Sequence, residues 1–137
     1  NFEKNKRQEM NLDFNWGKYF TEEEFKCSHT GKCDMDQDFI DRINQLRDQY
    51  GKPIKITSGY RDATHPIEAR KKEPGAHASG YACDIGVRGA DALQIIGIAL
   101  QLGFTGIGVN QKGSGRFIHL DILNGTPQRP RPTIWSY

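Results

Sequence analysis

Residues 35–50, MDQDFIDRINQLRDQY, place apolar side chains every three or four positions, the spacing that puts them on one face of a helix. This apolar stripe consists of Phe39, Ile43, Leu46 and Tyr50. Asp34 or Asp36 could cap the start of the helix, and Gly51 could end it. The pattern predicts an amphipathic helix whose apolar face packs against a core.

A second helix is expected at residues 90–103, ADALQIIGIALQLG, which are apolar enough for a helix packed on a sheet and end at Gly103. Short apolar or alternating segments predict strands, and turn residues separate them. The expected strands are 53–57, 81–85, 104–109 and 116–123, with turns at 58–61 and 110–115. Two helices on a small, mainly antiparallel sheet make an α+β domain.

The two ends of the chain lack these patterns. Residues 1–18 are polar and are expected to form a surface segment, which leaves residues 19–137 as a single domain. Residues 126–137, TPQRPRPTIWSY, contain three prolines, which predicts an extended strap over the surface. We expect Trp135 to anchor this strap.

Alternation along two of the expected strands assigns their side chains to opposite faces. In RFIHLDIL (116–123), the aliphatic face expected against the helices consists of Ile118, Leu120 and Ile122. His119 and Asp121 therefore point together to the other face. In YACDI (81–85), Asp84 lies on the face opposite Cys83 and Ile85, so each strand presents a potential ligand on a face made mostly of small residues.

Composition narrows the function classes. The chain has 137 residues, a length that suits one domain with a modest core, and a net charge of +2 with a pI of about 8.5. This weak basicity gives no strong case for nucleic-acid binding but suits an acidic polymer such as a bacterial wall. No apolar run is long enough to span a membrane, and the start NFEKNKRQEM lacks the apolar region of a signal peptide. We expect a monomer that neither inserts into a membrane nor binds nucleic acid.

Three cysteines leave the redox compartment open. Cys27 and Cys33 flank a short loop, CSHTGKC, in which Gly31 would let a disulfide close. A structural zinc site that also used His29 would have three ligands where such sites usually have four, so a disulfide or free thiols are favoured over metal. Cys83 lies in an apolar run and is expected to be a buried small side chain.

Three residues form a candidate metal site. His77 and Asp84 lie seven positions apart in PGAHASGYACDIG (74–86), and the small residues between them allow the backbone to fold tightly. With His119 they make a His/Asp/His set, and catalytic zinc is commonly held by three protein ligands with water in the fourth position. Spacing alone does not show that such distant residues meet, so a structural role for each histidine stays open.

Five segments in order, and Trp135 after them, resemble the zinc D-Ala-D-Ala carboxypeptidase/endopeptidase family, peptidase M15, and its small bacterial and phage branch in particular. The segments are YFTEEEFKC (19–27), LRDQYGKPIKITSGYR (46–61), HASGYACDI (77–85), GFTGIGV (103–109) and RFIHLD (116–121). The combination of SGYR, HxxGxAxD and HxD is the specific part. The resemblance spans residues 19–137.

The resemblance implies roles for individual residues. It implies that Zn²⁺ binds in a cleft on the sheet face, with ligands His77, Asp84 and His119. It implies that Arg61 steadies the substrate carbonyl as negative charge develops on the oxygen, a task for which a fixed guanidinium is suited. It also places Ser58 and Tyr60 against the substrate.

Two positions depart from the family pattern. Many relatives carry an acidic general base three residues before the last histidine, where this chain has Arg116, which cannot accept a proton. Asp121 could activate the water instead, or it could only orient His119 as a supporting carboxylate. A serine often found two residues before the first ligand is Gly75 here, which removes one possible hydrogen bond to substrate.

The resemblance implies a zinc peptidase that hydrolyses peptidoglycan stem peptides next to a D-amino acid. Such an enzyme would act on the cell wall outside the cytoplasm or be carried in a phage particle. The protein could be a carboxypeptidase or an endopeptidase, because the length of the cleft cannot be deduced from the sequence. The alternative is a non-catalytic zinc-bearing module that binds the wall or another partner, and Arg116 at the expected base position keeps this alternative open.

Overall fold

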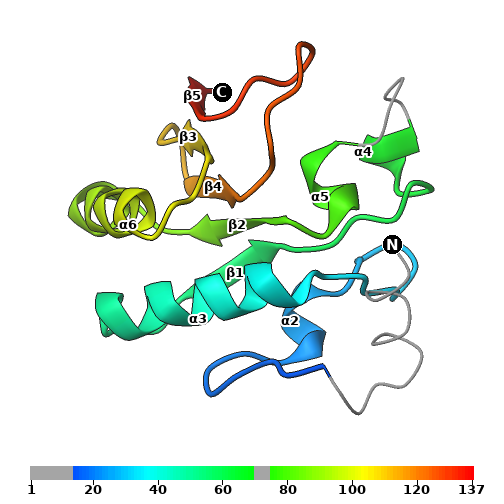
Figure 1. The fold of residues 1–137 in the computed structure, drawn as a ribbon, viewed down its shortest axis with the longest axis horizontal. Coiled ribbons are helices and arrows are strands. Elements are labelled where there is room, and N and C mark those ends of the chain that lie inside the picture. The colour runs from blue at the N-terminus through cyan, green and yellow to red at the C-terminus, as the bar shows by residue number, and fades with distance from the viewer. Residues whose placement is uncertain (1–13, 70–74) are drawn as a thin grey trace.

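A five-stranded sheet forms the centre of the structure, a computed structural model that describes residues 14–69 and 75–137. The strands are β1 (Lys55–Ser58), β2 (Ala82–Gly86), β3 (Gly106–Asn110), β4 (Phe117–Asp121) and β5 (Thr133–Ser136). Their order in the sheet is β1-β2-β4-β3-β5, and every neighbouring pair is antiparallel except β3 and β5. The expected α+β class with a mainly antiparallel sheet is confirmed (Figure 1).

Two long helices, α3 (Gln37–Tyr50) and α6 (Gly89–Gln101), correspond to the two that the apolar pattern predicts. Of the two candidate caps for α3, Asp36 is the one used, because its carboxylate accepts a hydrogen bond from the backbone N–H of Phe39 at 3.2 Å. Gly51 ends α3 in the left-handed conformation, with φ of +77°. Each boundary lies within about two residues of its expected place.

Three short helices were not expected from the sequence. They are α2 (Glu22–Phe25), α4 (Pro66–Ala69) and α5 (Ala76–Ser79). The start of α2 does carry a signal, because Thr21 and Glu24 form a capping box in which each caps the other's backbone. Four residues are too few for an apolar period to show, which explains why the pattern did not predict these helices.

The core lies between the two long helices and one face of the sheet. Ile43 and Leu46 of α3 and Ile95 of α6 are fully buried against Ile118 and Leu120 of β4. Burying one such side chain contributes about 1.5–3 kcal/mol, so this face fixes which way the strands present their remaining side chains. Asp84, His119 and Asp121 consequently lie on the face away from the long helices, as the alternation predicted.

The C-terminal segment corrects the expectation of an extended strap. Residues 133–136 form β5, which joins the edge of the sheet parallel to β3. The backbone N–H of Thr133 donates to the carbonyl of Thr105 at 2.9 Å, and that of Tyr137 donates to the carbonyl of Val109 at 3.2 Å. The prolines precede the strand, so they do not interrupt its ladder of hydrogen bonds.

Other sequence expectations concern the N-terminal segment and the cysteines. Residues 1–13 of the expected surface segment lie outside the described residues, whereas Phe14 and Trp16 pack against the core. All three cysteines are free thiols, and Cys27 accepts a hydrogen bond from the backbone of Asp62 at 3.3 Å. Cys83 is buried, as expected. In the part of the chain described, no helix has both the length and the apolar character needed to cross a membrane.

Candidate metal centre

Three buried side chains meet on the face of the sheet away from the long helices. His77, Asp84 and His119 each offer one ligand atom, and these atoms lie within 4.8 Å of one another. Within residues 14–69 and 75–137, this is the one group of three or more His, Cys, Asp or Glu side chains that could hold a metal ion. Cys27, Cys33 and His29 form no such group.

The turn after β1 fixes the orientation of His77, which lies on α5. The Nδ1–H of His77 donates to the carbonyl of Gly59 at 2.8 Å, and the N–H of Arg61 donates to the carbonyl of His77 at 3.2 Å. Since Nδ1 donates to this carbonyl, Nε2 is the nitrogen that faces Asp84 and is left to bind a metal. Gly59 is required here, because a Cβ would lie 2.5 Å from the carbonyl oxygen of Phe25. The SGYR turn therefore orients a ligand through its backbone.

Strand pairing brings Asp84 and His119 together. The two residues are direct partners in the antiparallel β2–β4 ladder, and His119 Nδ1 lies 3.1 Å from Asp84 Oδ1. On the other side of the ring, His119 Nε2–H donates to Asp121 Oδ2 at 2.7 Å. That bond makes Nδ1 the nitrogen that faces the cluster and is left to bind a metal.

Asp121 is itself held by a second residue. Its carboxylate is fully buried and accepts two hydrogen bonds from Arg131, from Nε at 2.9 Å and from Nη2 at 2.8 Å. The backbone N–H of Leu123 also donates to it, at 3.3 Å. A two-pronged guanidinium–carboxylate pair fixes both groups in the plane that they share. Asp121 thus has a rigid position behind His119.

Two glycines of β3 make room for this arrangement. A Cβ at Gly106 would overlap the carboxylate of Asp121 and Nε of Arg131. A Cβ at Gly108 would lie 2.7 Å from Nε1 of Trp135, whose ring packs 5.0 Å from that of His119 between centroids. The short run GIG therefore allows β5 and its flanking residues to close over the ligands.

The charges of the cluster stabilise one another. Burial raises the pKa of the Asp84 carboxyl, but hydrogen bonds from His119 and His77 outweigh it and hold that pKa well below its usual range. Burial also raises the pKa of the Asp121 carboxyl, but hydrogen bonds from His119 and Arg131 outweigh it, so this pKa is depressed as well. For His119, burial lowers the pKa, but its bonds to Asp121 and Asp84 raise it above the ordinary value. Both carboxylates are ionised at neutral pH.

The distances from Asp84 to the two histidines fit a shared metal ion. Asp84 Oδ1 lies 3.2 Å from His77 Nε2 and 3.1 Å from His119 Nδ1. Two atoms bound to one zinc ion at tetrahedral geometry lie about 3.3–3.4 Å apart, given bonds of ~2.0–2.1 Å. Two imidazoles and one carboxylate, with the second nitrogen of each imidazole engaged by a hydrogen-bond acceptor, form a donor set that this metal uses.

The remaining candidate residues lie around the cluster. The guanidinium of Arg61 is 18% exposed and lies 3.9 Å from Asp84 Oδ2 and 3.6 Å from Glu68 Oε2. Ser58, at the end of β1, is the partner of Asp84 in the β1–β2 ladder, whereas the ring of Tyr60 packs against the core. Ser58 therefore lies near the candidate ligands, whereas the ring of Tyr60 contributes to packing of the core.

The structure shows the contacts of Arg116 and Gly75, the two residues that depart from the family pattern. Arg116 precedes β4, and its Nε donates to the carbonyl of Gly113 at 2.9 Å. The backbone N–H of Gly75 donates to Glu68 Oε1 at 2.8 Å, and Gly75 caps the start of α5, the helix that carries His77. Glu68 therefore links the start of α5 to Arg61.

Sequence reasoning missed Glu68 and Arg131. Glu68 lies in a four-residue helix with no apolar period, and Arg131 lies among prolines. A buried carboxylate such as Asp121 requires a charged partner, but only the placement of β5 identifies that partner as Arg131. The sequence indicates that Asp121 would need a partner if it were buried, but it does not show which residue is that partner.

The chain matches the model of a known protein family. No curated protein matches the chain. A family model described as peptidase M15 matches residues 18–121, which include the His/Asp/His group, Arg61 and Asp121. The match covers well over half of the chain and ends at the last residue of β4, before Arg131 and β5. The suspected family is therefore confirmed: the chain belongs to the peptidase M15 family.

Proposed function

We propose that the protein is a zinc-dependent peptidase that hydrolyses peptide bonds in peptidoglycan stem peptides, next to a D-amino acid. Family membership supports peptidase activity. The observation that carries the proposal is the buried His77, Asp84 and His119 group, in which Asp84 Oδ1 lies 3.1–3.2 Å from a ring nitrogen of each histidine. Its partner would be peptidoglycan. The protein would act at the cell wall or be delivered to it by a phage particle.

In this proposal, His77 Nε2, an oxygen of Asp84 and His119 Nδ1 hold the zinc ion. Zinc bound by three protein ligands lowers the pKa of a bound water to ~7 and polarises the carbonyl to be attacked. The chain's contribution is to keep these three side chains in fixed positions. Gly59 holds His77 through its carbonyl, and Asp121 holds His119 through its carboxylate.

Arg61 is the candidate for stabilising the charge that develops on the substrate carbonyl. Its guanidinium lies beside Asp84 and is held by the buried Glu68, yet it is partly open to solvent. A donor fixed in place before the reaction needs no reorganisation when negative charge appears, which is why such groups lower barriers. Arg61 has both the position and the restraint for this role.

For Asp121, the contacts favour positioning over general-base catalysis. The carboxylate accepts hydrogen bonds from His119, Arg131 and the backbone of Leu123, and it is fully buried. A base that accepts a proton from water needs a free lone pair within reach of that water and a pKa nearer the operating pH. We therefore assign Asp121 to holding His119 in place.

The metal content of the purified protein tests the ligand assignment. Protein purified without added metal should contain about one equivalent of zinc, because three buried ligands converge on one position. His77→Ala and His119→Ala should lose the metal, whereas His65→Ala, a histidine outside the cluster, should keep it. Unchanged zinc in folded His77→Ala and His119→Ala proteins would refute the assignment.

Digestion of purified peptidoglycan tests the activity. The zinc-loaded protein should release peptide fragments, a chelator should stop the release, and zinc should restore it. Running the assay on walls of different stem-peptide chemistry identifies the bond cut and separates carboxypeptidase from endopeptidase activity. Metal-dependent binding to the wall without release of any fragment would instead establish a non-catalytic zinc-bearing module.

A zinc titration of Asp121→Asn separates the two roles of Asp121. A positioning role predicts a zinc affinity lower by ~10–100-fold and a rate that excess zinc largely restores. A general-base role predicts normal zinc content and a rate lower by about 10²-fold or more at every zinc concentration. Full activity at ordinary zinc levels would exclude both roles.

A further inference from the structure

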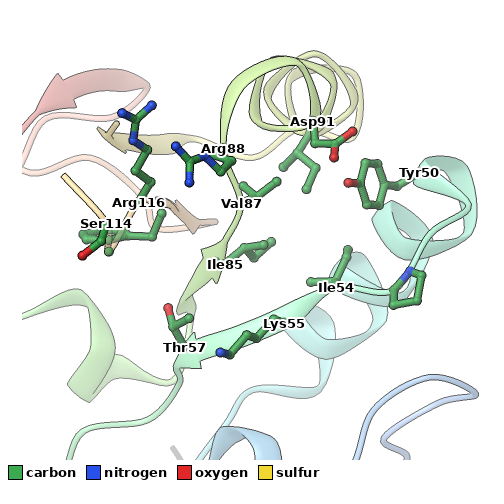
Figure 2. A pocket seen from close by; sticks show the side chains of 15 residues that line it. Tyr50, Ile54, Lys55, Thr57, Ile85, Val87, Arg88, Asp91, Ser114 and Arg116 are labelled. Atoms are coloured by element: carbon green, nitrogen blue, oxygen red, sulfur yellow. The ribbon is translucent and has the colours of Figure 1, made fainter. Parts of the chain in front are cut away.

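A pocket of about 590 Å³ opens where β1 and β2 diverge, beyond the candidate ligands (Figure 2). Its apolar wall consists of Ile54, Ile85 and Val87, and the ring of Tyr50 closes one end. Basic residues lie on its rim, and in Figure 2 Arg88 and Arg116 lie toward the end away from Tyr50. The pocket thus combines an apolar wall with a cationic rim.

The rim carries an excess of positive charge. Lys55, Arg88 and Arg116 line the pocket together with one carboxylate, Asp91, which is already paired with Lys52. Across the described segments, the ammonium of Lys55 and the guanidinium of Arg88 form no ion pair or side-chain hydrogen bond. The bond from Arg116 Nε to Gly113 holds that guanidinium at the rim. Uncompensated cations around a pocket favour an anionic occupant.

The pocket lies at the end of the sheet and reaches the face that carries the candidate ligands, whereas Ile85 of its apolar wall belongs to the face that packs against the helices. Gly86 and Phe117 line the pocket, and they are paired with each other two positions along β2 and β4 from the pair Asp84 and His119. Two strand residues span about 7 Å, and two residues of an extended peptide span the same distance. A peptide lying along these strands with one bond at the ligands would therefore place a residue at the pocket.

Gly86 lies between the two places, and the side chain of Thr57 packs over it. Gly86 lies on the same face of β2 as Asp84, and a Cβ there would lie 2.8 Å from the Cγ2 of Thr57. Glycine at this position therefore leaves room for Thr57, which itself lines the pocket.

We propose that this pocket binds a carboxylate-bearing residue of the peptide substrate, two residues from the bond that is hydrolysed. Lys55, Arg88 and Arg116 recognise the carboxylate, and the apolar wall accommodates the side chain beside it. This inference rests on the proposed peptidase function and adds to it a determinant of specificity. Arg116, which occupies the position of the family's general base, thereby has a role in binding.

Two peptides that differ in one group test the proposal. The probes are a short D-alanine-containing peptide with a free C-terminal carboxylate and the same peptide as its C-terminal amide. Each is titrated into the zinc-loaded protein at fixed ionic strength, binding is followed by backbone amide NMR shifts, and kcat/KM is measured in parallel. The variants are Lys55→Met/Arg88→Met and, as a control, Lys112→Met, which removes an exposed charge from the β3–β4 turn outside the pocket.

We expect the acid to bind wild-type protein about 10-fold or more tightly than the amide, because charge-assisted hydrogen bonds are the strong ones. The largest shifts should lie at Gly86, Val87 and residues 114–117. In the double variant, acid binding should fall to the level of the amide while amide binding is unchanged, and Lys112→Met should leave both unchanged. Equal binding of acid and amide to wild-type protein, or equal weakening of both by the double variant, overturns the inference.

The two readouts separate this inference from the proposed function. If neither peptide is hydrolysed but the acid binds more tightly at the pocket, the peptidase proposal fails for this substrate and the binding site stands. If both are hydrolysed with equal kcat/KM and the variants change neither, the pocket has no role and the peptidase proposal stands. Absence of saturable binding by either peptide at about 10 mM also overturns the inference.

Discussion

Replacing Arg131 with methionine removes the partner of the buried Asp121 carboxylate. The side chain of Arg131 is 6% exposed and that of Asp121 is fully buried, so water cannot replace the two hydrogen bonds that the guanidinium donates. Leaving one member of a buried ion pair without its partner costs about 3–5 kcal/mol. We therefore expect Arg131→Met to lower the free energy of unfolding of the metal-free protein by ~3–5 kcal/mol at pH 7.

The same substitution should weaken metal binding, because Asp121 would no longer be held behind His119. Loss of a group that orients a ligand typically lowers metal affinity by ~10–100-fold. At saturating zinc, this reduces the stabilisation that zinc provides by a further ~1.4–2.7 kcal/mol. The two effects are separated by urea unfolding with a chelator and again with zinc in fixed excess.

A double-mutant cycle with Asp121→Asn isolates the interaction. Once Asp121 is neutral, removal of Arg131 no longer leaves a buried charge unpaired, so the double variant should be at least ~1.5 kcal/mol more stable than the sum of the single effects predicts. Arg129→Met is the control, since it removes a charge from the same segment and the Nε of Arg129 has no hydrogen-bond partner among the described residues. Additivity within ~0.5 kcal/mol would refute the reasoning.

Three further outcomes follow from the site. Arg61→Ala should retain zinc but lower kcat by ~10²–10³, measured on a peptide that the wild type cleaves; a normal kcat would remove Arg61 from the mechanism. Gly108→Ala should destabilise the protein by ~1–3 kcal/mol, because its Cβ would meet Trp135. Gly97→Ala, which has open space around it in α6, should instead stabilise the protein by ~0.5–1 kcal/mol. Thermal unfolding measures both effects, and equal effects would contradict the crowding at β3. The metal-free protein should be most stable between about pH 4 and pH 6.5. The depressed pKa values of Asp84 and Asp121 contribute stability that is lost as pH falls below this window, and the raised pKa of His119 contributes stability that is lost as pH rises above it. Urea unfolding across pH tests the window, and a monotonic rise in stability to pH 9 would exclude the contribution of His119.

The elements that could be predicted from sequence are those whose side chains repeat. The apolar stripe of α3 and the alternation on β4 follow from the need to bury one face, and alternation alone placed His119 and Asp121 on the face away from the helices. What the sequence left open was contact between distant segments. Asp84 and His119 are 35 positions apart, and only the pairing of β2 with β4 makes them neighbours.

The C-terminal strand was missed for a different reason. A proline-rich segment carries no period, and the four residues of β5 are stabilised by the edge of β3 rather than by their own pattern. The role of Arg131 could not be predicted either, since it depends on where β5 lies. The pocket beside Arg88 and Arg116 could not be predicted from the sequence for the same reason, because it exists only where β1 and β2 diverge.

The strand order also determines when during folding the ligands can come together. The β3–β4 hairpin is local in sequence, whereas pairing of β2 with β4 must first close a loop that contains α6, which slows its formation. His119 meets Asp84 only at that step, so an unfolded chain offers zinc no more than the neighbouring pair His77 and Asp84. Zinc held by all three should therefore slow unfolding far more than it speeds folding, and the lifetime of the folded chain should depend on the metal even where its rate of formation does not.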